Sequence, residues 1–288
     1  MTRATQPYRN RIALIFDFDS TLGPSTYHKV LSNHGYNPGA FIDERVKPLI
    51  DDEWDEILAR YHALIQASRN GENPITKTSI ETIGKNLDLY PDVEHMFEQV
   101  RTWVNDNDYD TDITVEFYML TAGMIEVPAA STIADKFKQI WAGECHFNDD
   151  GEIDFVKRII THPEKNRYLI QLAKGLHLEG LIQPQNIHEN MPLSDYYIPF
   201  DQMIYVGDGA SDMSVFYLME DKGGIAIGVV PGDSVQDWEG YDDMTERRRV
   251  QNLAVADYSE ESELMTTIRH AVRSIVEKIA LRKMSQKQ

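Results

Sequence analysis

The sequence predicts an α/β fold of three layers, in which helices cover both faces of a parallel sheet and a helical cap is inserted after the first strand. Short apolar runs rich in Ile, Val, Phe and Tyr alternate with segments of helical periodicity. Runs of this kind are typical of strands buried on both faces, and their alternation with helices indicates a parallel sheet. One long interval without a strand-like run indicates the cap.

Five apolar runs are the predicted strands. Three of them, at 12–16, 113–120 and 203–206, each run into a cluster of small, polar or acidic residues. Two further runs, at 224–230 and 253–256, are similar but end without such a cluster. We expect all five to lie side by side in one sheet.

Three segments between or after these runs have helical patterns. Residues 93–103 carry apolar side chains at helical spacing directly after Pro91 and Asp92. Thr161 and Glu164 have the spacing of a capping box, which predicts a helix leading into 168–173. Residues 264–279 place their apolar side chains on one stripe.

The interval 23–90 contains no strand-like run. Apolar residues follow helical spacing from 46 to 65, a turn is expected at 70–74, and a second helix is expected at 78–87. A single crossover between two parallel strands needs far fewer helical residues than this interval contains. We therefore expect two domains, an α/β core of residues 1–22 and 91–288 and a helical cap of residues 23–90.

Charge and cysteine content narrow the range of partners. The 288 residues include 47 acidic and 28 basic ones, and the formal net charge is −19. A field of that sign repels nucleic acids and anionic membranes, so neither is an expected partner. Cys145 is the single cysteine, and no apolar stretch has membrane-spanning length. We expect a soluble cytoplasmic protein.

The clusters after the first three runs indicate where the chemistry lies. Ligands bind outside the carboxyl ends of parallel strands, so 17–21, 121–123 and 207–212 should converge there. Carboxylates gathered in one place repel one another unless a cation joins them, and oxygen ligands with room for substrate suit Mg²⁺. One aspartate could then attack phosphorus, and a second one two residues later could protonate the leaving oxygen.

A transferring phosphoryl group also needs positive charge. Lys165 lies in the first turn of a predicted helix, where the helix dipole disfavours a cation, and this suggests another role for it. Lys157 and Arg158 are the competing basic residues, and they lie in an extended polar stretch.

Four motifs occur in this order: DFDSTL, LTAG, Lys165 and GDGASD. Together they resemble the haloacid dehalogenase (HAD) superfamily, in its phosphoserine phosphatase-like branch, over the whole chain. The resemblance implies a Rossmann-like, HAD-like core and an Mg²⁺-dependent phosphatase that works through an aspartyl-phosphate. It also implies a role for each motif residue: Asp17 as nucleophile, Asp19 as general acid/base, and Thr121 and Lys165 as phosphoryl ligands. The metal site it implies consists of Asp17, Asp208 and the Asp19 carbonyl as ligands, with Asp212 orienting the water shell of the metal.

The chain departs from this branch at three places. Motif two reads Thr121-Ala122-Gly123 instead of a small residue followed by two glycines, and Ser211 replaces the usual asparagine. The glutamate expected shortly after motif one, which would meet a substrate ammonium, is absent from 23–28. A preference for phosphoserine is therefore not expected, although Glu44 or Glu53 of the cap could replace that contact.

Other cap residues are open to two interpretations. His28, Arg45, Arg60 and His62 could face the cleft and meet a second anionic group, but we expect them to face solvent. Trp54 and Tyr61 share the apolar stripe, which favours core packing over stacking on a substrate.

The expected function is hydrolysis of a small phosphorylated metabolite, and several alternatives to it remain. Phosphoryl transfer to an acceptor other than water would use the same residues, and a non-catalytic binding or regulatory protein could share the scaffold. A halide-removing enzyme is disfavoured because it would need neither Asp19 nor Mg²⁺. No G-x-G-x-x-G follows the first strand, which excludes a dinucleotide-binding protein of that type.

Overall fold

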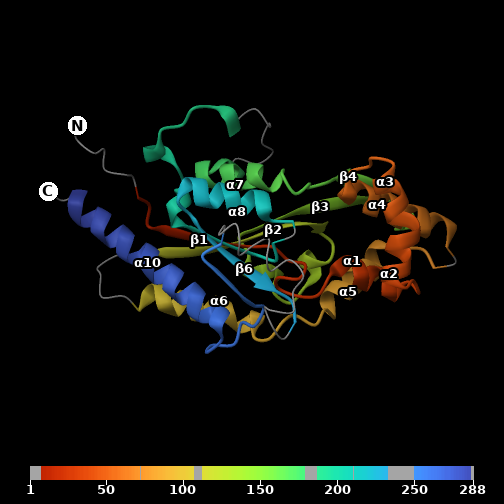
Figure 1. Cartoon of the computed structure of the whole chain (residues 1–288), viewed down its shortest axis with the longest axis horizontal. Coiled ribbons are helices and arrows are strands. Elements are labelled where there is room, and N and C mark those ends of the chain that lie inside the picture. Colours follow the sequence, from red (N-terminus) through yellow and green to blue (C-terminus); the bar gives the residue numbers. More distant parts are fainter. Residues whose placement is uncertain are drawn as a thin grey trace.

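A computed structural model describes residues 8–71, 73–106, 112–178, 187–209, 211–232 and 250–286. Within these ranges seven strands form one sheet, in the order β4-β3-β2-β1-β5-β6-β7 (Figure 1). Neighbouring strands are parallel except for β3 and β4, which are antiparallel. The strands are β1 (Arg11–Phe16), β2 (Thr114–Met124), β3 (Gln139–Phe147), β4 (Ile153–Arg158), β5 (Met203–Gly207), β6 (Ile225–Val230) and β7 (Asn252–Val255).

Helices cover both faces of this sheet (Figure 1). On one face lie α6 (Val93–Asn105) and α10 (Glu263–Gln286), and on the other lie α7 (Lys165–Lys174) and α8 (Met213–Lys222). Side chains of β1 alternate between the two layers: Leu14 and Phe16 pack into the core beneath α6 and α10, whereas Ile15 packs beneath α7 and α8. The predicted three-layer α/β class is therefore confirmed.

All five predicted strands are present, but the hairpin of β3 and β4 was missed. The outer strand β4 carries Asp154, Lys157 and Arg158, and its side chains are mostly half-buried or exposed. Such an edge strand lacks the continuous apolar run by which buried strands are recognised. The stretch containing Lys157 and Arg158 is extended, as expected, but it is a strand.

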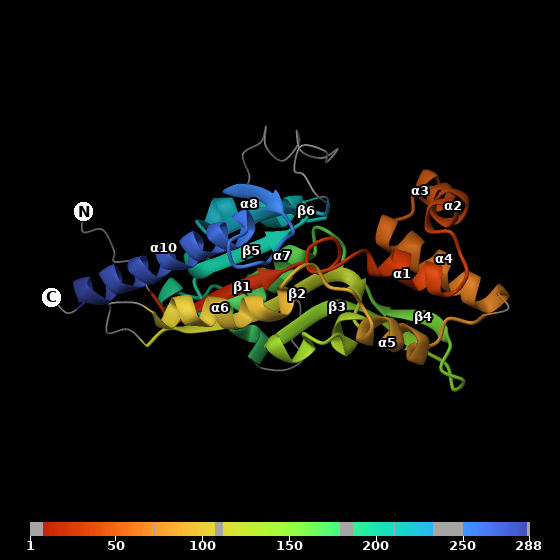
Figure 2. The same ribbon diagram turned by 90° about the horizontal axis from the view of Figure 1, so that it is seen from below.

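Five α-helices and one short π-helix follow β1 in the described residues, and they gather at the end of the sheet where β4 extends past the other strands (Figure 2). They are α1 (Thr26–Asn33), α2 (Pro38–Phe41), the π-helix Ile42–Val46, α3 (Lys47–Asp51), α4 (Glu56–Asn70) and α5 (Lys77–Lys85). The helical periodicity from 46 to 65 does not belong to one helix. The chain turns after α3, where Glu53 has a φ of 66°, and Asp55 caps α4 with its side chain.

The inserted helices are joined to the β3–β4 hairpin by main-chain hydrogen bonds. The Lys77 amide donates to the Gly151 carbonyl at 2.9 Å, and the Ile153 amide donates to the Ile75 carbonyl at 2.8 Å. Arg69 of α4 donates to the Asp154 carbonyl at 2.6 Å. The segment before α5 therefore pairs with the start of β4 like a short additional strand.

Short 3₁₀ helices complete the described connections, at Pro128–Ala130, Ala134–Lys136, Leu176–Leu178, Leu193–Asp195 and Phe200–Gln202. Among the described residues, no helix combines the length and the hydropathy needed to cross a membrane.

Candidate active site

The carboxyl ends of β1, β2 and β5 meet at one edge of the sheet. Phe16 lies opposite both Met119 and Val206 in the parallel register. Asp17, Thr121 and Asp208 follow these three positions by one or two residues, so the sheet brings the predicted clusters side by side. Thr121 still belongs to β2, which extends to Met124.

Asp17 is buried at the end of β1. Its amide donates to the Val206 carbonyl at 2.9 Å, which holds the main chain against β5. Ser211 donates its hydroxyl to Asp17 Oδ2 at 3.4 Å. Burial raises the pKa of the Asp17 carboxyl to about 7, although Lys165 lowers it in part.

Asp17, Asp208 and Asp212 form an acidic cluster, in which one carboxylate oxygen from each lies within 4.8 Å of the others. Asp17 Oδ1, Asp208 Oδ1 and Asp212 Oδ2 are buried without a hydrogen-bond partner. Burial, together with the neighbouring carboxylates, raises the pKa of Asp208 to about 8. Three converging carboxylates, with Asp208 Oδ1 and Asp212 Oδ2 free of hydrogen-bond partners, are the donor set of a hard divalent cation, so the cluster fits Mg²⁺.

Lys165 is fully buried beside this cluster. Its Nζ lies 2.6 Å from Asp212 Oδ1, 3.1 Å from Ser211 Oγ and 3.2 Å from Asp17 Oδ1. Burial alone would lower the pKa of Lys165, but the carboxylates of Asp17 and Asp212 raise it above its ordinary value. Tyr205 donates to the same Asp212 oxygen at 2.7 Å, which fixes this carboxylate in place.

Lys165 lies in the candidate site, whereas the two other basic residues considered for the phosphoryl-binding role do not. Lys157 and Arg158 lie on β4 and form ion pairs with Glu144 at 2.5 and 3.0 Å. The predicted capping box before Lys165 is not formed, because α7 begins at Lys165 without a side-chain cap. Glu164 instead pairs with Arg167, one turn further along, at 2.7 Å.

Asp19 lies outside the acidic cluster and has different partners. Its Oδ1 accepts a hydrogen bond from the Thr26 amide at 2.6 Å. Burial raises the pKa of Asp19, against the lowering effect of the hydrogen bonds from Thr26. A Cβ atom at Gly123 would lie 2.9 Å from Asp19 Oδ2, so a larger residue there would displace this carboxylate oxygen. Thr121 Oγ1 is held by the Gly123 amide at 3.1 Å.

A cleft of about 430 Å³ lies between these strand ends and the helices α1 and α4. Asp17, Asp19, Thr121 and Asp208 line its floor, and the wall residues missing from the predicted site are His28, Glu56, Ile57, Arg60, Tyr61, Leu64, Met124 and His162. Helical periodicity shows which residues share a face of α4, but the side on which the core lies depends on tertiary packing.

The cap residues that the sequence left open to two interpretations fall into two groups, those that line the cleft and those that do not. His28 and Arg60 line the cleft, and Tyr61 both lines it and is buried, with 4% of its surface exposed. His62 instead packs against Trp54 on the other side of α4. Arg45 lies over the rings of two aromatic residues, Tyr36 and Phe41.

The cap acid that lines the cleft is Glu56, and neither Glu44 nor Glu53 does so. Glu56 Oε1 accepts from Arg60 Nη2 at 2.6 Å and from Nε at 3.1 Å. Burial and Arg60 lower the pKa of His28, and burial and Lys165 lower that of His162. At neutral pH the cap wall therefore carries a paired Arg60 beside an uncharged His28.

Three comparisons with known proteins show which folds this one resembles. No protein-family model matches the chain. An uncharacterized protein of Borreliella burgdorferi is 22% identical in an alignment that covers 74% of this chain and 79% of that protein. A HAD-family hydrolase from Salmonella enterica serovar Typhi superposes with a TM-score of 0.57 at 12% identity, over 86% of this chain and 67% of that one.

Two phosphoserine phosphatase structures also superpose, each with a TM-score of 0.56 over 91% of this chain and 99% of theirs. One is a phospho-aspartyl intermediate analogue at 13% identity, and the other is a substrate complex at 15% identity. The chain thus has the fold of HAD hydrolases and phosphoserine phosphatases, which confirms the predicted resemblance at the level of the fold.

Proposed function

We propose that the protein is an Mg²⁺-dependent phosphatase that hydrolyses a small phosphomonoester through an aspartyl-phosphate on Asp17. The observation that carries this proposal is the buried arrangement of Asp17, Lys165 and the unpaired oxygens of Asp208 and Asp212. It provides a nucleophile, a fixed cation and a metal-binding donor set at one point of the cleft. In this proposal residues 23–90 are a cap over a core of residues 1–22 and 91–288.

The metal would be held by the carboxylates of Asp17, Asp208 and Asp212, with the Asp19 main-chain carbonyl as a further ligand. When bound, Mg²⁺ neutralises the charge on the phosphoryl oxygens and the nucleophile. It would also remove the mutual repulsion of the three carboxylates.

The protein's own side chains divide the reaction into two displacements. A carboxylate oxygen of Asp17 bonds to phosphorus while the bond to the leaving oxygen breaks, and Asp19 gives its proton to that oxygen. Asp19 then takes a proton from water as the water oxygen bonds to phosphorus. The bond between phosphorus and Asp17 breaks, which releases inorganic phosphate. Lys165 and Thr121 would hold the phosphoryl oxygens during both steps.

The size of the cleft and the residues that line it limit which phosphomonoesters we propose as substrates. The cleft volume of about 430 Å³ admits a small monoester, and a substrate bound there would displace water from the phosphorylation step. Glu56, the acid in its wall, is already paired with Arg60. We therefore propose that free phosphoserine is not singled out over other small monoesters.

The test is release of inorganic phosphate from a set of small phosphomonoesters, before and after treatment with a chelator and again with Mg²⁺ restored. We expect turnover to vanish in chelator and to return with Mg²⁺. Asp17→Asn should abolish both turnover and the acid-stable, hydroxylamine-sensitive phosphoenzyme, because an amide is a very poor nucleophile. Undiminished turnover in chelator would contradict the metal assignment, and an active Asp17→Asn would contradict the nucleophile.

A further inference from the structure

A second groove, of about 400 Å³, lies between α4 and the edge strand β4, which pack against each other (Figure 1). On α4 it is lined by Leu58, His62 and Arg69. Tyr61 of the same helix lines the active-site cleft instead. On β4 every residue from 154 to 159 lines the groove. Side chains of a strand alternate between its two faces, so consecutive residues share a groove only where it follows the edge of the strand.

Among the residues that the structure describes, this edge of β4 is open beyond residue 154. β4 is the last strand in the order of the sheet and pairs with β3. The segment Ile75–Lys77 covers only the start of the edge, at 151–153, and Arg69 Nη2 donates to the Asp154 carbonyl at 2.6 Å. The open edge of a strand is a template for another extended chain.

Exposed apolar side chains stand on both walls of the groove. Phe155 of β4 has 68% of its surface exposed, and Leu58 of α4 has 38%. Trp54, just before α4, also lines the groove. Large apolar groups gathered beside an open strand edge indicate a surface that another molecule covers.

The charge of the groove has the opposite sign to that of the whole chain. Arg69, Lys157 and Arg158 line it, and Asp154 is the acid among its described lining residues. Lys157 and Arg158 share the carboxylate of Glu144, at 2.5 and 3.0 Å. These five side chains together leave a positive charge, whereas the whole chain carries −19. The groove therefore attracts an acidic ligand.

We propose that this groove binds an extended acidic peptide of a partner protein, which adds to β4 as a further strand. Main-chain hydrogen bonds to residues 155–158 would hold the peptide, and its alternate side chains would contact the two walls. At the rise of a strand, residues 154–159 extend about 17 Å, which suits a peptide of about six residues. A second copy of this chain fits less well, because two molecules of charge −19 repel each other. The inference does not depend on the phosphatase proposal.

The experiment selects binders from a library of random octapeptides displayed on phage, with counter-selection against Leu58→Asp. We expect the selected peptides to be acidic, with apolar residues at alternate positions. In fluorescence anisotropy with a labelled selected peptide, Leu58→Asp and Arg69→Glu should each weaken binding by about tenfold or more. The matched controls lie outside the groove: Ile50→Asp, at a residue 39% exposed, and Lys85→Glu, at an exposed residue of α5, should change it by less than about twofold. A melting curve checks the fold of each variant.

Two further measurements test the mode of binding and the kind of occupant. The selected peptide N-methylated at every residue donates no main-chain hydrogen bond, so it should lose at least about tenfold in affinity. Equal affinity of the methylated peptide, selection of basic peptides, or no peptide that distinguishes the wild type from Leu58→Asp would overturn the inference. Sedimentation velocity completes the test, because a dimer that Leu58→Asp dissociates would make a second copy the occupant and contradict the peptide.

Discussion

At the scale of single residues, the buried Lys165 differs from the exposed Lys157 in what each cation neutralises. Lys165 stands between two carboxylates of the candidate site, whereas Lys157 pairs with Glu144 on the edge strand. We expect Lys165→Ala to lower kcat/KM on the order of 10²-fold or more, because a donor to the developing phosphoryl charge is lost. Lys157→Ala is the matched control and should change kcat/KM by less than about threefold.

If Lys157→Ala were the damaging variant instead, the lysine that binds the phosphoryl group would lie on β4, and the assignment of Lys165 would be wrong.

The raised pKa values of Asp17 and Asp208 predict how stability depends on pH. In the unfolded chain both carboxyls have a pKa near 3.9, and in the folded protein without metal the values are about 7 and about 8. Between these limits the folded protein binds more protons, so its free energy of unfolding should fall as the pH rises from about 4 to about 8.

Urea unfolding in chelator across this range measures the effect. Mg²⁺ binds the deprotonated cluster, so it should add more stability at about pH 8 than at about pH 6. If stability in chelator rose over this interval, or the increment from Mg²⁺ were independent of pH, the two carboxyls would not be the titrating groups.

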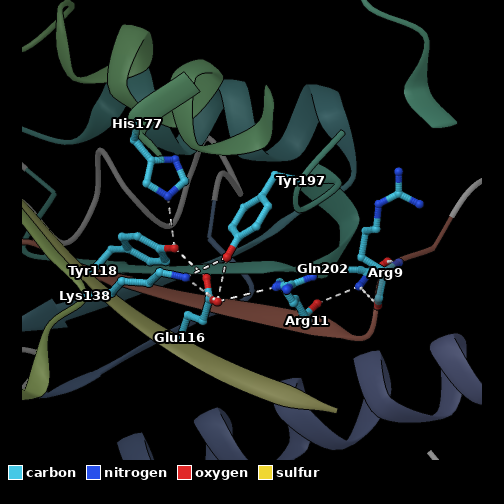
Figure 3. Close-up of polar contacts among 8 residues, drawn as sticks. All are labelled: Arg9, Arg11, Glu116, Tyr118, Lys138, His177, Tyr197 and Gln202. Atoms are coloured by element: carbon cyan, nitrogen blue, oxygen red, sulfur yellow. Dashed lines mark hydrogen bonds and ion pairs between the residues drawn. The ribbon is translucent and has the colours of Figure 1, made fainter. Parts of the chain in front are cut away.

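At the scale of elements, β2 carries a second polar network near its start (Figure 3). Glu116, 8% exposed, accepts hydrogen bonds from Tyr118 at 2.5 Å, Lys138 at 2.6 Å and Tyr197 at 2.8 Å. Arg11 of β1 lies 3.5 Å from the same carboxylate. One acid therefore connects β1, β2 and the segments that precede β3 and β5.

Glu116→Gln should lower the free energy of unfolding by about 1–3 kcal/mol, because the buried Tyr118 and the half-buried Tyr197 lose a charged acceptor. Catalysis should be unaffected, since Thr121 lies five residues further along β2, about 16 Å away at the rise of a strand. Glu144→Gln, which affects ion pairs of exposed basic residues, is the control and should cost less than about 1 kcal/mol. A loss of activity in Glu116→Gln without a loss of stability would contradict a purely structural network.

How much the sequence predicts differs between elements. The buried strands β1, β2 and β5 are recognised by their apolar runs, and their register places Asp17, Thr121 and Asp208 together. The hairpin of β3 and β4 escaped prediction because most side chains of β4 are half-buried or exposed, and because Gly143 and Glu144 interrupt the apolar residues of β3. The cleft-facing side of α4, which presents Arg60 and Tyr61, is set by packing against the core, and periodicity alone does not contain that information.

At the scale of the whole molecule, enclosure and net charge act together on substrate choice. We expect kcat/KM for a phosphopeptide or a 5′-phosphorylated oligonucleotide to be at least about 100-fold below that for the best small monoester, because the cleft holds about 430 Å³ and the net charge is −19. About 1 M salt shortens the Debye length to about 3 Å and separates the two causes, since it removes repulsion but not enclosure.

The comparison should include phosphoserine, phosphorylated alcohols, sugar phosphates and nucleoside monophosphates. A hundredfold preference for phosphoserine would show that the absence of the glutamate from 23–28 has been compensated within the cleft.

The pairing of Ile75–Lys77 with Gly151–Ile153 has a consequence for folding during synthesis. The ribosome releases the N-terminal partner long before the hairpin that receives it, so α5 emerges while its hydrogen-bonding partners do not yet exist. A contact this distant in sequence closes late and slowly. We expect a nascent chain arrested before residue 151 to leave α5 sensitive to protease, and one arrested well beyond β4 to protect it.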